Sequence, residues 1–136
     1  MINNIGLIKL RRFSDKYGNL IPIEGNLDIP FEIKRIYFIY GVDKNITRGF
    51  HAHRKLHQIL ICVNGKVKIK IKTPSEEEIV ELNDPSVGLY LGRMTWREMF
   101  DFSEDAVLLV LASQYYDEKD YIRNYDFYLK EFENMF

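Results

Sequence analysis

Several features that would assign a protein quickly to a class are missing from this sequence. It has a single cysteine, Cys62, so no internal disulfide can form, which fits a reducing compartment. No apolar run approaches the about twenty residues of a membrane helix, and the first residues do not resemble a signal peptide. Nineteen basic residues nearly balance twenty acidic ones, which argues against nucleic acid or a membrane surface as the main partner. We expect a cytoplasmic protein whose 136 residues form one domain.

Short apolar or alternating segments separated by turn signals predict an all-β protein, either an antiparallel sandwich or a small barrel. Residues 66–72 alternate lysine with valine or isoleucine, so one face should be buried and the lysine face solvated. The uninterrupted apolar run 106–112 is typical of a sheet interior. Further strands are expected at 5–13, 20–23, 33–42, 59–63, 79–82, 88–91 and 95–102.

Three local patterns add detail to this prediction. Asn64-Gly65 is the signature of a tight hairpin between the segments on either side of it. Both faces of 33–42 are largely apolar, so we expect both to be covered. The tail carries apolar residues at helical spacing and should form one amphipathic C-terminal helix, with Tyr125, Leu129, Phe132 and Phe136 on one face.

All three histidines lie within residues 47–58, which read Thr-Arg-Gly-Phe-His-Ala-His-Arg-Lys-Leu-His-Gln. Because alternate residues of a strand share a face, His51 and His53 should project into one space. Two imidazoles on one wall fit either a metal site or an acid/base site. The alternative is that surface or core histidines cluster here by chance.

The spacing of His51, His53, Gln58 and Gly65 resembles the first cupin motif, which implies a jelly-roll fold. In metal-binding cupins the two histidines, a glutamate at the position of Gln58 and a later histidine bind the ion. Here Arg97 stands where the later histidine would be.

A guanidinium group is permanently cationic and only donates hydrogen bonds, so Arg97 would repel a divalent ion. His57 could serve as a third ligand, but we expect no metal and no other cofactor. The acid/base interpretation of the histidine pair therefore remains.

Four segments together are similar to the sugar 3,4-ketoisomerases that act on dTDP-4-keto-6-deoxy-D-glucose. They span most of the chain between residues 33 and 129, and are 48–55, 83–90, 101–113 and 120–125. The resemblance implies a cofactor-free cupin homodimer whose N-terminal strands, within 1–23, are exchanged between subunits. Each barrel would hold one nucleotide sugar.

The reaction of that family moves a ketone from C4 to C3 through an enediol. By motif position His51 would be the base that removes the C3 proton, since neutral imidazole has a suitable pKa. His53 would shuttle protons between the two oxygens or orient His51. The resemblance places Tyr37 in the same barrel as a donor to the enediolate, although core packing is the alternative for a tyrosine in so aromatic a strand.

Arginines in these segments are candidates for the diphosphate, because the guanidinium fork matches two phosphate oxygens. They are Arg35, Arg48 and Arg123. Tyr17 and Arg97 are expected at the sugar, where they would influence which face of C4 is protonated. Galacto-forming members of the family tend to carry histidine at the Arg97 position, so this chain should form the gluco-configured dTDP-3-keto-6-deoxy-D-glucose. That product would feed a 3-aminotransferase on the way to a 3-amino-3,6-dideoxyglucose sugar of a surface glycan. The alternative is that Arg97 binds phosphate or pairs with Glu98 and that the configuration at C4 is set elsewhere.

Two other functions fit the same pattern. One is the related 3,5-epimerisation of the same substrate, but that family pairs its catalytic histidine with an aspartate, and no such pair is evident in the sequence. The other is a cupin that binds a sugar nucleotide without turnover, since one fold hosts many functions.

Overall fold

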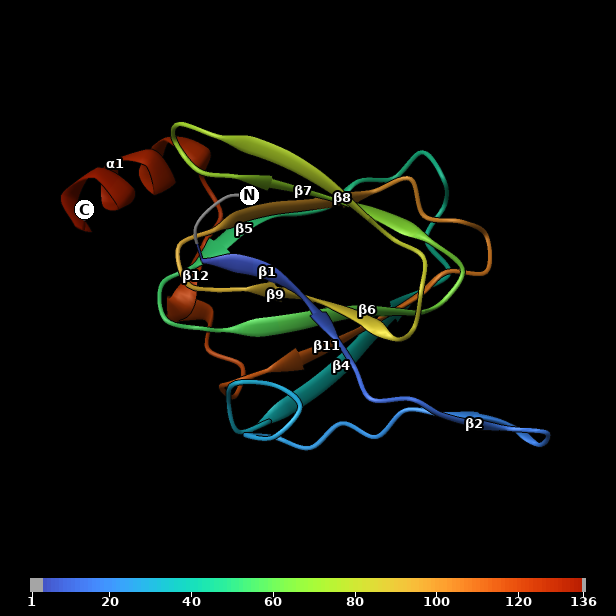
Figure 1. The fold of residues 1–136 in the computed structure, drawn as a ribbon. Coiled ribbons are helices and arrows are strands. Elements are labelled where there is room, and N and C mark those ends of the chain that lie inside the picture. Colours follow the sequence, from blue (N-terminus) through green and yellow to red (C-terminus); the bar gives the residue numbers. More distant parts are fainter. Residues whose placement is uncertain (1–3, 136) are drawn as a thin grey trace.

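The computed structural model describes residues 4–135 and consists mainly of two facing five-stranded antiparallel sheets (Figure 1). The first sheet has the order β1 (Ile5–Lys9), β9 (Val87–Leu91), β6 (Gln58–Asn64), β11 (Val107–Ala112) and β4 (Arg35–Tyr40). The second has the order β12 (Tyr121–Ile122), β5 (Arg48–His53), β10 (Trp96–Phe100), β7 (Val67–Lys72) and β8 (Glu77–Leu82). A hairpin of β2 (Phe13–Asp15) and β3 (Gly18–Leu20), a short helix η1 (Glu118–Asp120) and α1 (Tyr125–Met135) complete the fold. The predicted jelly roll with a C-terminal helix is confirmed.

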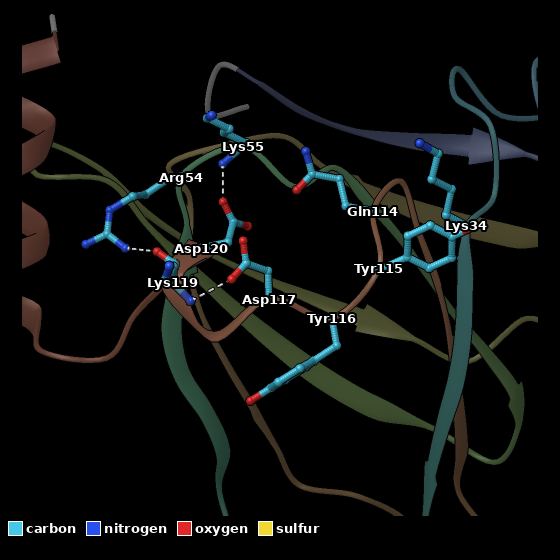
Figure 2. Close-up of a pocket in the computed structure, with 9 residues that line it drawn as sticks. All are labelled: Lys34, Arg54, Lys55, Gln114, Tyr115, Tyr116, Asp117, Lys119 and Asp120. Carbon is cyan, nitrogen blue, oxygen red and sulfur yellow. Dashed lines mark hydrogen bonds between the residues drawn. The ribbon is translucent and has the colours of Figure 1, made fainter.

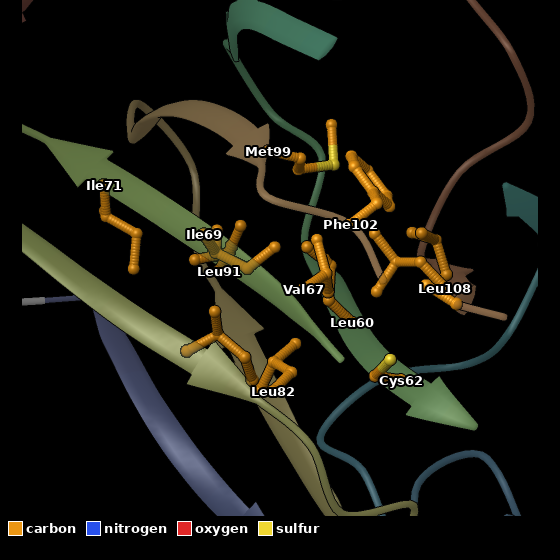
Figure 3. Packing of buried hydrophobic residues seen from close by; sticks show 13 residues of the cluster. Leu60, Cys62, Val67, Ile69, Ile71, Leu82, Leu91, Met99, Phe102 and Leu108 are labelled. Atoms are coloured by element: carbon orange, nitrogen blue, oxygen red, sulfur yellow. The ribbon is translucent and has the colours of Figure 1, made fainter. Parts of the chain in front are cut away.

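The main core lies between the two sheets and is built from alternate residues of their strands (Figure 3). In β7, Val67, Ile69 and Ile71 have no exposed surface, while the lysines between them are partly exposed. The alternation predicted for 66–72 is therefore confirmed, and β11 supplies the continuous apolar strand expected at 106–112.

Helix α1 closes one end of the second sheet, as its amphipathic pattern predicts. Tyr125, Leu129 and Phe132 pack against a cluster around Trp96. Tyr128, which the spacing argument omitted, is the helix residue with no exposed surface, and its hydroxyl donates to the Met94 carbonyl at 2.9 Å. The Phe136 of the prediction lies outside the described residues.

Three local predictions were wrong. Strand β1 ends at Lys9 and not at residue 13, and no strand continues past Leu20 into 21–23. Asn64-Gly65 does not make a hairpin, because β6 and β7 belong to different sheets. Gly65 has a φ of +70° and a Cβ there would clash with the Ser103 hydroxyl oxygen, so the chain can cross closely between the sheets only with glycine at this position. A turn signal specifies a local change of direction, but not the strand that the chain pairs with next.

No segment among residues 4–135 covers the outer face of β4, so the cover expected for this apolar face is not supplied by this part of the chain. Ile36, Phe38 and Tyr40 are 59%, 60% and 69% exposed on the edge strand of the first sheet. The β2–β3 hairpin extends away from the barrel rather than folding over this face (Figure 1). Among residues 4–135 there is no helix with the length and apolar character needed to cross a membrane.

Candidate active site

A β-bulge in β5 places the histidine pair. Arg97 pairs with His51 but Glu98 pairs with Gly49, so Phe50 is the extra residue. Gly49 has a φ of +97°, and a Cβ there would lie 2.9 Å from the Arg97 carbonyl oxygen, so this position requires glycine. Beyond the bulge, the rings of His51 and His53 lie 4.9 Å apart, centroid to centroid, and 9% and 0% of these residues are exposed.

His53 is held by a buried aspartate that sequence reasoning missed. Its Nδ1 lies 3.1 Å from Oδ2 of Asp120, and the other carboxylate oxygen accepts the backbone N–H of Lys55 at 2.8 Å. Because a carboxylate only accepts, Nδ1 of His53 carries the hydrogen and Nε2 keeps its lone pair. That Nε2 is buried and finds no partner within the described part of the chain. No His–Asp pair is evident in the sequence because the two residues are 67 positions apart.

Both imidazoles are neutral near pH 7. Burial, reinforced by the positive charge of Arg97, lowers the pKa of His51 to about 3. The same two causes lower the pKa of His53 well below its ordinary value. The pair is therefore available to accept protons rather than to donate them at the start of a reaction.

Arg97 lies inside the barrel and is 1% exposed. Its Nη1 donates to Oε1 of Gln58, and Nε2 of Gln58 donates to the Tyr37 hydroxyl oxygen at 3.1 Å. Burial lowers the pKa of Arg97 to about 10, so it remains charged at neutral pH. It makes no pair with Glu98, which instead accepts from the Trp96 indole at 3.0 Å.

Two of the predicted phosphate-binding arginines lie against aromatic rings near the histidines, and Arg123 also donates to both carboxylate oxygens of Glu118, at 2.9 and 3.0 Å. The Arg35 guanidinium lies over the rings of Tyr37 and Tyr116, at 5.4 and 5.5 Å. Arg123 lies 4.2 Å from the ring of Tyr121. That ring in turn lies 4.4 Å from the ring of His53, so Tyr121 forms a further wall of the site, one that no motif in the sequence indicates.

The other predicted residues are less closely associated with the histidines. Arg48 is exposed at the start of β5, before the bulge. Tyr17 is 85% exposed on the β2–β3 hairpin, so this chain does not bring it to its own barrel (Figure 1). His57 turns to β9, where its Nδ1 lies 2.6 Å from the Tyr90 hydroxyl. Across residues 4–135, no three His, Cys, Asp or Glu side chains are grouped to hold a metal ion.

A cleft of about 730 Å³ is lined in part by Asp120. Its lining is rich in basic and aromatic side chains and comprises Lys34, Arg54, Lys55, Gln114, Tyr115, Tyr116, Asp117, Lys119 and Asp120 (Figure 2). Arg54 donates to the carbonyl of Lys119 and is ion-paired with Glu131 of α1 at 2.6 Å. These contacts attach η1, and with it Asp120, to the rest of the fold.

Residues 3–133 match the family model described as FdtA: WxcM-like, C-terminal. The chain belongs to this family. It is 47% identical, over 91% of its length and 89% of the relative's, to a TDP-4-oxo-6-deoxy-alpha-D-glucose-3,4-oxoisomerase from Aneurinibacillus thermoaerophilus.

Solved structures of family members have the same fold. An H51N mutant of a 3,4-ketoisomerase from Thermoanaerobacterium thermosaccharolyticum, in complex with TDP-4-keto-6-deoxyglucose, superposes with a TM-score of 0.98 at 65% identity, covering 100% of this chain and 99% of that one. A TDP-quinovose 3,4-ketoisomerase from Campylobacter jejuni matches with a TM-score of 0.91 at 47% identity, over 95% and 99% of the two chains. Two Streptomyces sugar epimerases match at 18% and 20% identity, which shows a shared fold alone.

Proposed function

We infer that this chain is a sugar-nucleotide 3,4-ketoisomerase, which converts dTDP-4-keto-6-deoxy-D-glucose into dTDP-3-keto-6-deoxy-D-glucose. The observation that carries this conclusion is the 65% identity, across the whole chain, to a ketoisomerase crystallised with the 4-keto sugar nucleotide. The site agrees with it, because a pair of neutral imidazoles at one face of the barrel is suited to proton transfer next to a ketone.

We assign the proton transfers as follows. His51 removes the C3 proton, which the adjacent C4 carbonyl makes acidic, and the resulting enediol is protonated at C4 as the ketone forms at C3. His53, oriented by Asp120, moves the proton between the two oxygens through its free Nε2. The Tyr37 hydroxyl donates to the enediolate oxygen. Removal of one such donor costs about 3 kcal/mol of transition-state stabilisation in other enzymes. Arg35, Arg48 and Arg123 bind the diphosphate.

Deuterium labelling tests this function against the alternatives. In deuterated water with dTDP-4-keto-6-deoxyglucose, NMR of an isomerase product shows the carbonyl at C3 and deuterium at C4. An epimerase labels C3 and C5 and leaves the carbonyl at C4, and a non-catalytic binder changes neither. The His53–Asp120 pair alone does not identify an epimerase, because the epimerase structures match too distantly to transfer their activity.

We propose that the active form is a homodimer in which the β2–β3 hairpin of the N-terminal segment 1–23 is exchanged, because β1 pairs with β9 of its own chain. The support is the exposed apolar face of β4 and the projecting β2–β3 hairpin, which would carry Tyr17 into the partner's barrel. Sedimentation at assay concentration should show a dimer. Phe38→Glu should weaken it and reduce activity, whereas Ile79→Glu, a similarly exposed position on β8, should not. An active wild-type monomer would contradict this proposal.

The enzyme should work without a metal. Gln58 and Arg97 occupy positions that supply ligands in metal-binding cupins, and Arg97 places a buried positive charge next to the histidines. Exhaustive chelation, verified by elemental analysis, should leave the isomerisation rate unchanged. Loss of activity that only a divalent ion restores would overturn the proposed mechanism.

The product should have the gluco configuration at C4. A buried, charged Arg97 cannot hand a proton to C4 as a histidine at this position could. Because H3 and H4 of the gluco sugar lie on opposite faces of the ring, C4 should instead be protonated from the face opposite to the one from which His51 takes the C3 proton. Tyr17 of the partner subunit would help to hold the sugar in that orientation. NMR of fresh product should show a large coupling between H4 and H5. A small coupling would indicate the galacto product and refute the stereochemical prediction while leaving the isomerase function intact.

We further propose that the chain is one domain and acts in the cytoplasm. Both sheets contribute to one continuous core, which supports a single folding unit. Cys62 is a buried free thiol whose pKa is raised by burial, so it is an inert core residue that suits a reducing compartment.

A further inference from the structure

The polar chain Arg97–Gln58–Tyr37 has a fixed hydrogen-bond direction. Arginine has only donors, so the Gln58 atom that faces it must be the carbonyl oxygen. The amide nitrogen of Gln58 consequently faces Tyr37 and donates to its hydroxyl oxygen at 3.1 Å. Arg97 also donates through Nη2 to the Thr95 carbonyl at 3.2 Å, which holds the guanidinium in place.

This direction determines where the Tyr37 hydrogen can go. Its oxygen already accepts from Gln58, so the O–H must point to another acceptor. Arg35 and Arg97, the charged groups around it, have no acceptor atoms. His53 Nε2 is an acceptor, but it has no hydrogen-bond partner among residues 4–135. The structure therefore leaves the Tyr37 hydrogen for an acceptor that arrives with the ligand.

We propose that Gln58 is a positioning residue for the isomerisation: anchored by Arg97, it holds the Tyr37 hydroxyl as a hydrogen-bond donor aimed at the sugar oxygen that becomes the enediolate. The inference deepens the proposed function and rests on it. It also explains why glutamine occupies a position where the cupin motif usually has glutamate. A glutamate would accept from both neighbours, so Tyr37 would donate into the protein and its hydrogen would be lost to the substrate.

Two substitutions at Gln58 separate positioning from structural support. Gln58→Glu keeps the shape and still pairs with Arg97, but reverses the hydrogen bond to Tyr37. Gln58→Met removes both hydrogen bonds of Gln58 and leaves Arg97 only its bond to the Thr95 carbonyl, yet frees the Tyr37 hydroxyl to turn to the substrate. If Gln58 is a positioning residue, kcat falls by about tenfold to a hundredfold from wild type in Gln58→Glu and by less in Gln58→Met. A structural role predicts the opposite order, because Gln58→Met is the more disruptive change to the buried network.

A double-mutant comparison shows whether Gln58 acts through Tyr37. Tyr37→Phe should lower kcat about a hundredfold, and adding Gln58→Glu to it should change kcat by less than about twofold, since the hydroxyl is already absent. If Gln58→Glu lowers kcat by the same factor in both backgrounds, it acts through charge or folding and the proposal is wrong. If Gln58→Met does not fold, the double-mutant comparison tests the proposal by itself.

A measurement without turnover keeps this proposal separate from the proposed function. Burial raises the pKa of Tyr37, and the charge of Arg97 and the hydrogen bond from Gln58 oppose that rise. With 13Cζ-labelled tyrosine, and the signal assigned by its loss in Tyr37→Phe, Gln58→Glu should raise the Tyr37 pKa further. An unchanged Tyr37 pKa overturns the hydrogen-bond direction. If Gln58→Glu raises the Tyr37 pKa but the wild-type protein does not isomerise the sugar, the hydrogen-bond direction is upheld and the proposed function is refuted.

Discussion

Replacing His51 with asparagine should lower the rate of isomerisation by about two to four decades, the scale expected for loss of a general base. Asparagine is polar and of similar size, so the barrel should stay intact, and binding of dTDP should persist because the diphosphate contacts lie elsewhere. The comparison variant is His57→Asn, which removes a partly buried histidine bound to Tyr90 rather than to the site. The prediction is checked by measuring the steady-state rates of His51→Asn and His57→Asn, and their affinity for dTDP by calorimetry.

The pH profile gives a second view of the same residue. Because burial and Arg97 lower the pKa of His51 from 6.5 to about 3, the free enzyme should keep its base unprotonated well into the acid range. As pH falls, kcat/KM should therefore stay constant through 6.5 and decline only at lower values. Activity in His51→Asn within a few-fold of wild type would remove His51 from the mechanism. An acid limb centred on 6.5 would show instead that the site is more solvated than the structure indicates.

Asp120→Asn should be the next most damaging change, with an expected loss of about two decades or more in kcat. Both carboxylate oxygens accept hydrogen bonds, one from the Lys55 N–H and the other from His53 and the Leu56 N–H. An amide has only one accepting oxygen, so its NH2 group must face a donor or a reversed imidazole. If His53 flips its tautomer to accept from that NH2, Nε2 gains the hydrogen and can no longer take a proton, as when the orienting aspartate of a serine protease is changed to asparagine.

Asp117→Asn is the matched control for this prediction. Asp117 is an exposed carboxylate three positions away and caps η1 by accepting the Lys119 N–H at 3.0 Å, a role that asparagine also fills. It should retain near wild-type kcat. NMR of 15N-labelled histidine should report the His53 tautomer in both variants. Equal activity of Asp120→Asn and wild type would mean that His53 needs no fixed tautomer for the reaction.

Local patterns in the sequence predicted much of the architecture. Alternation in residues 66–72 and helical spacing in the tail correspond to β7 and α1, because burial of one face requires that periodicity wherever the element lies. The placement of His51 and His53 on one wall follows from their spacing of two residues in a strand. The family resemblance, carried by segments spread along the chain, predicted the jelly roll and the isomerase function.

The predictions that failed all depend on which distant segments meet. The sequence does not show that Asn64-Gly65 crosses between sheets, nor that the first strand finds a partner only as far as Lys9.

By itself, then, the sequence determined the strand and helix periodicities, the histidine pair and the replacement of two cupin metal ligands by Gln58 and Arg97. Only the tertiary structure decided that Asp120 orients His53 and that Arg97 and Gln58 direct the Tyr37 hydroxyl. The physical reason is that hydrogen-bond direction and pKa depend on burial and on neighbours far away in the chain, which local residue patterns do not encode.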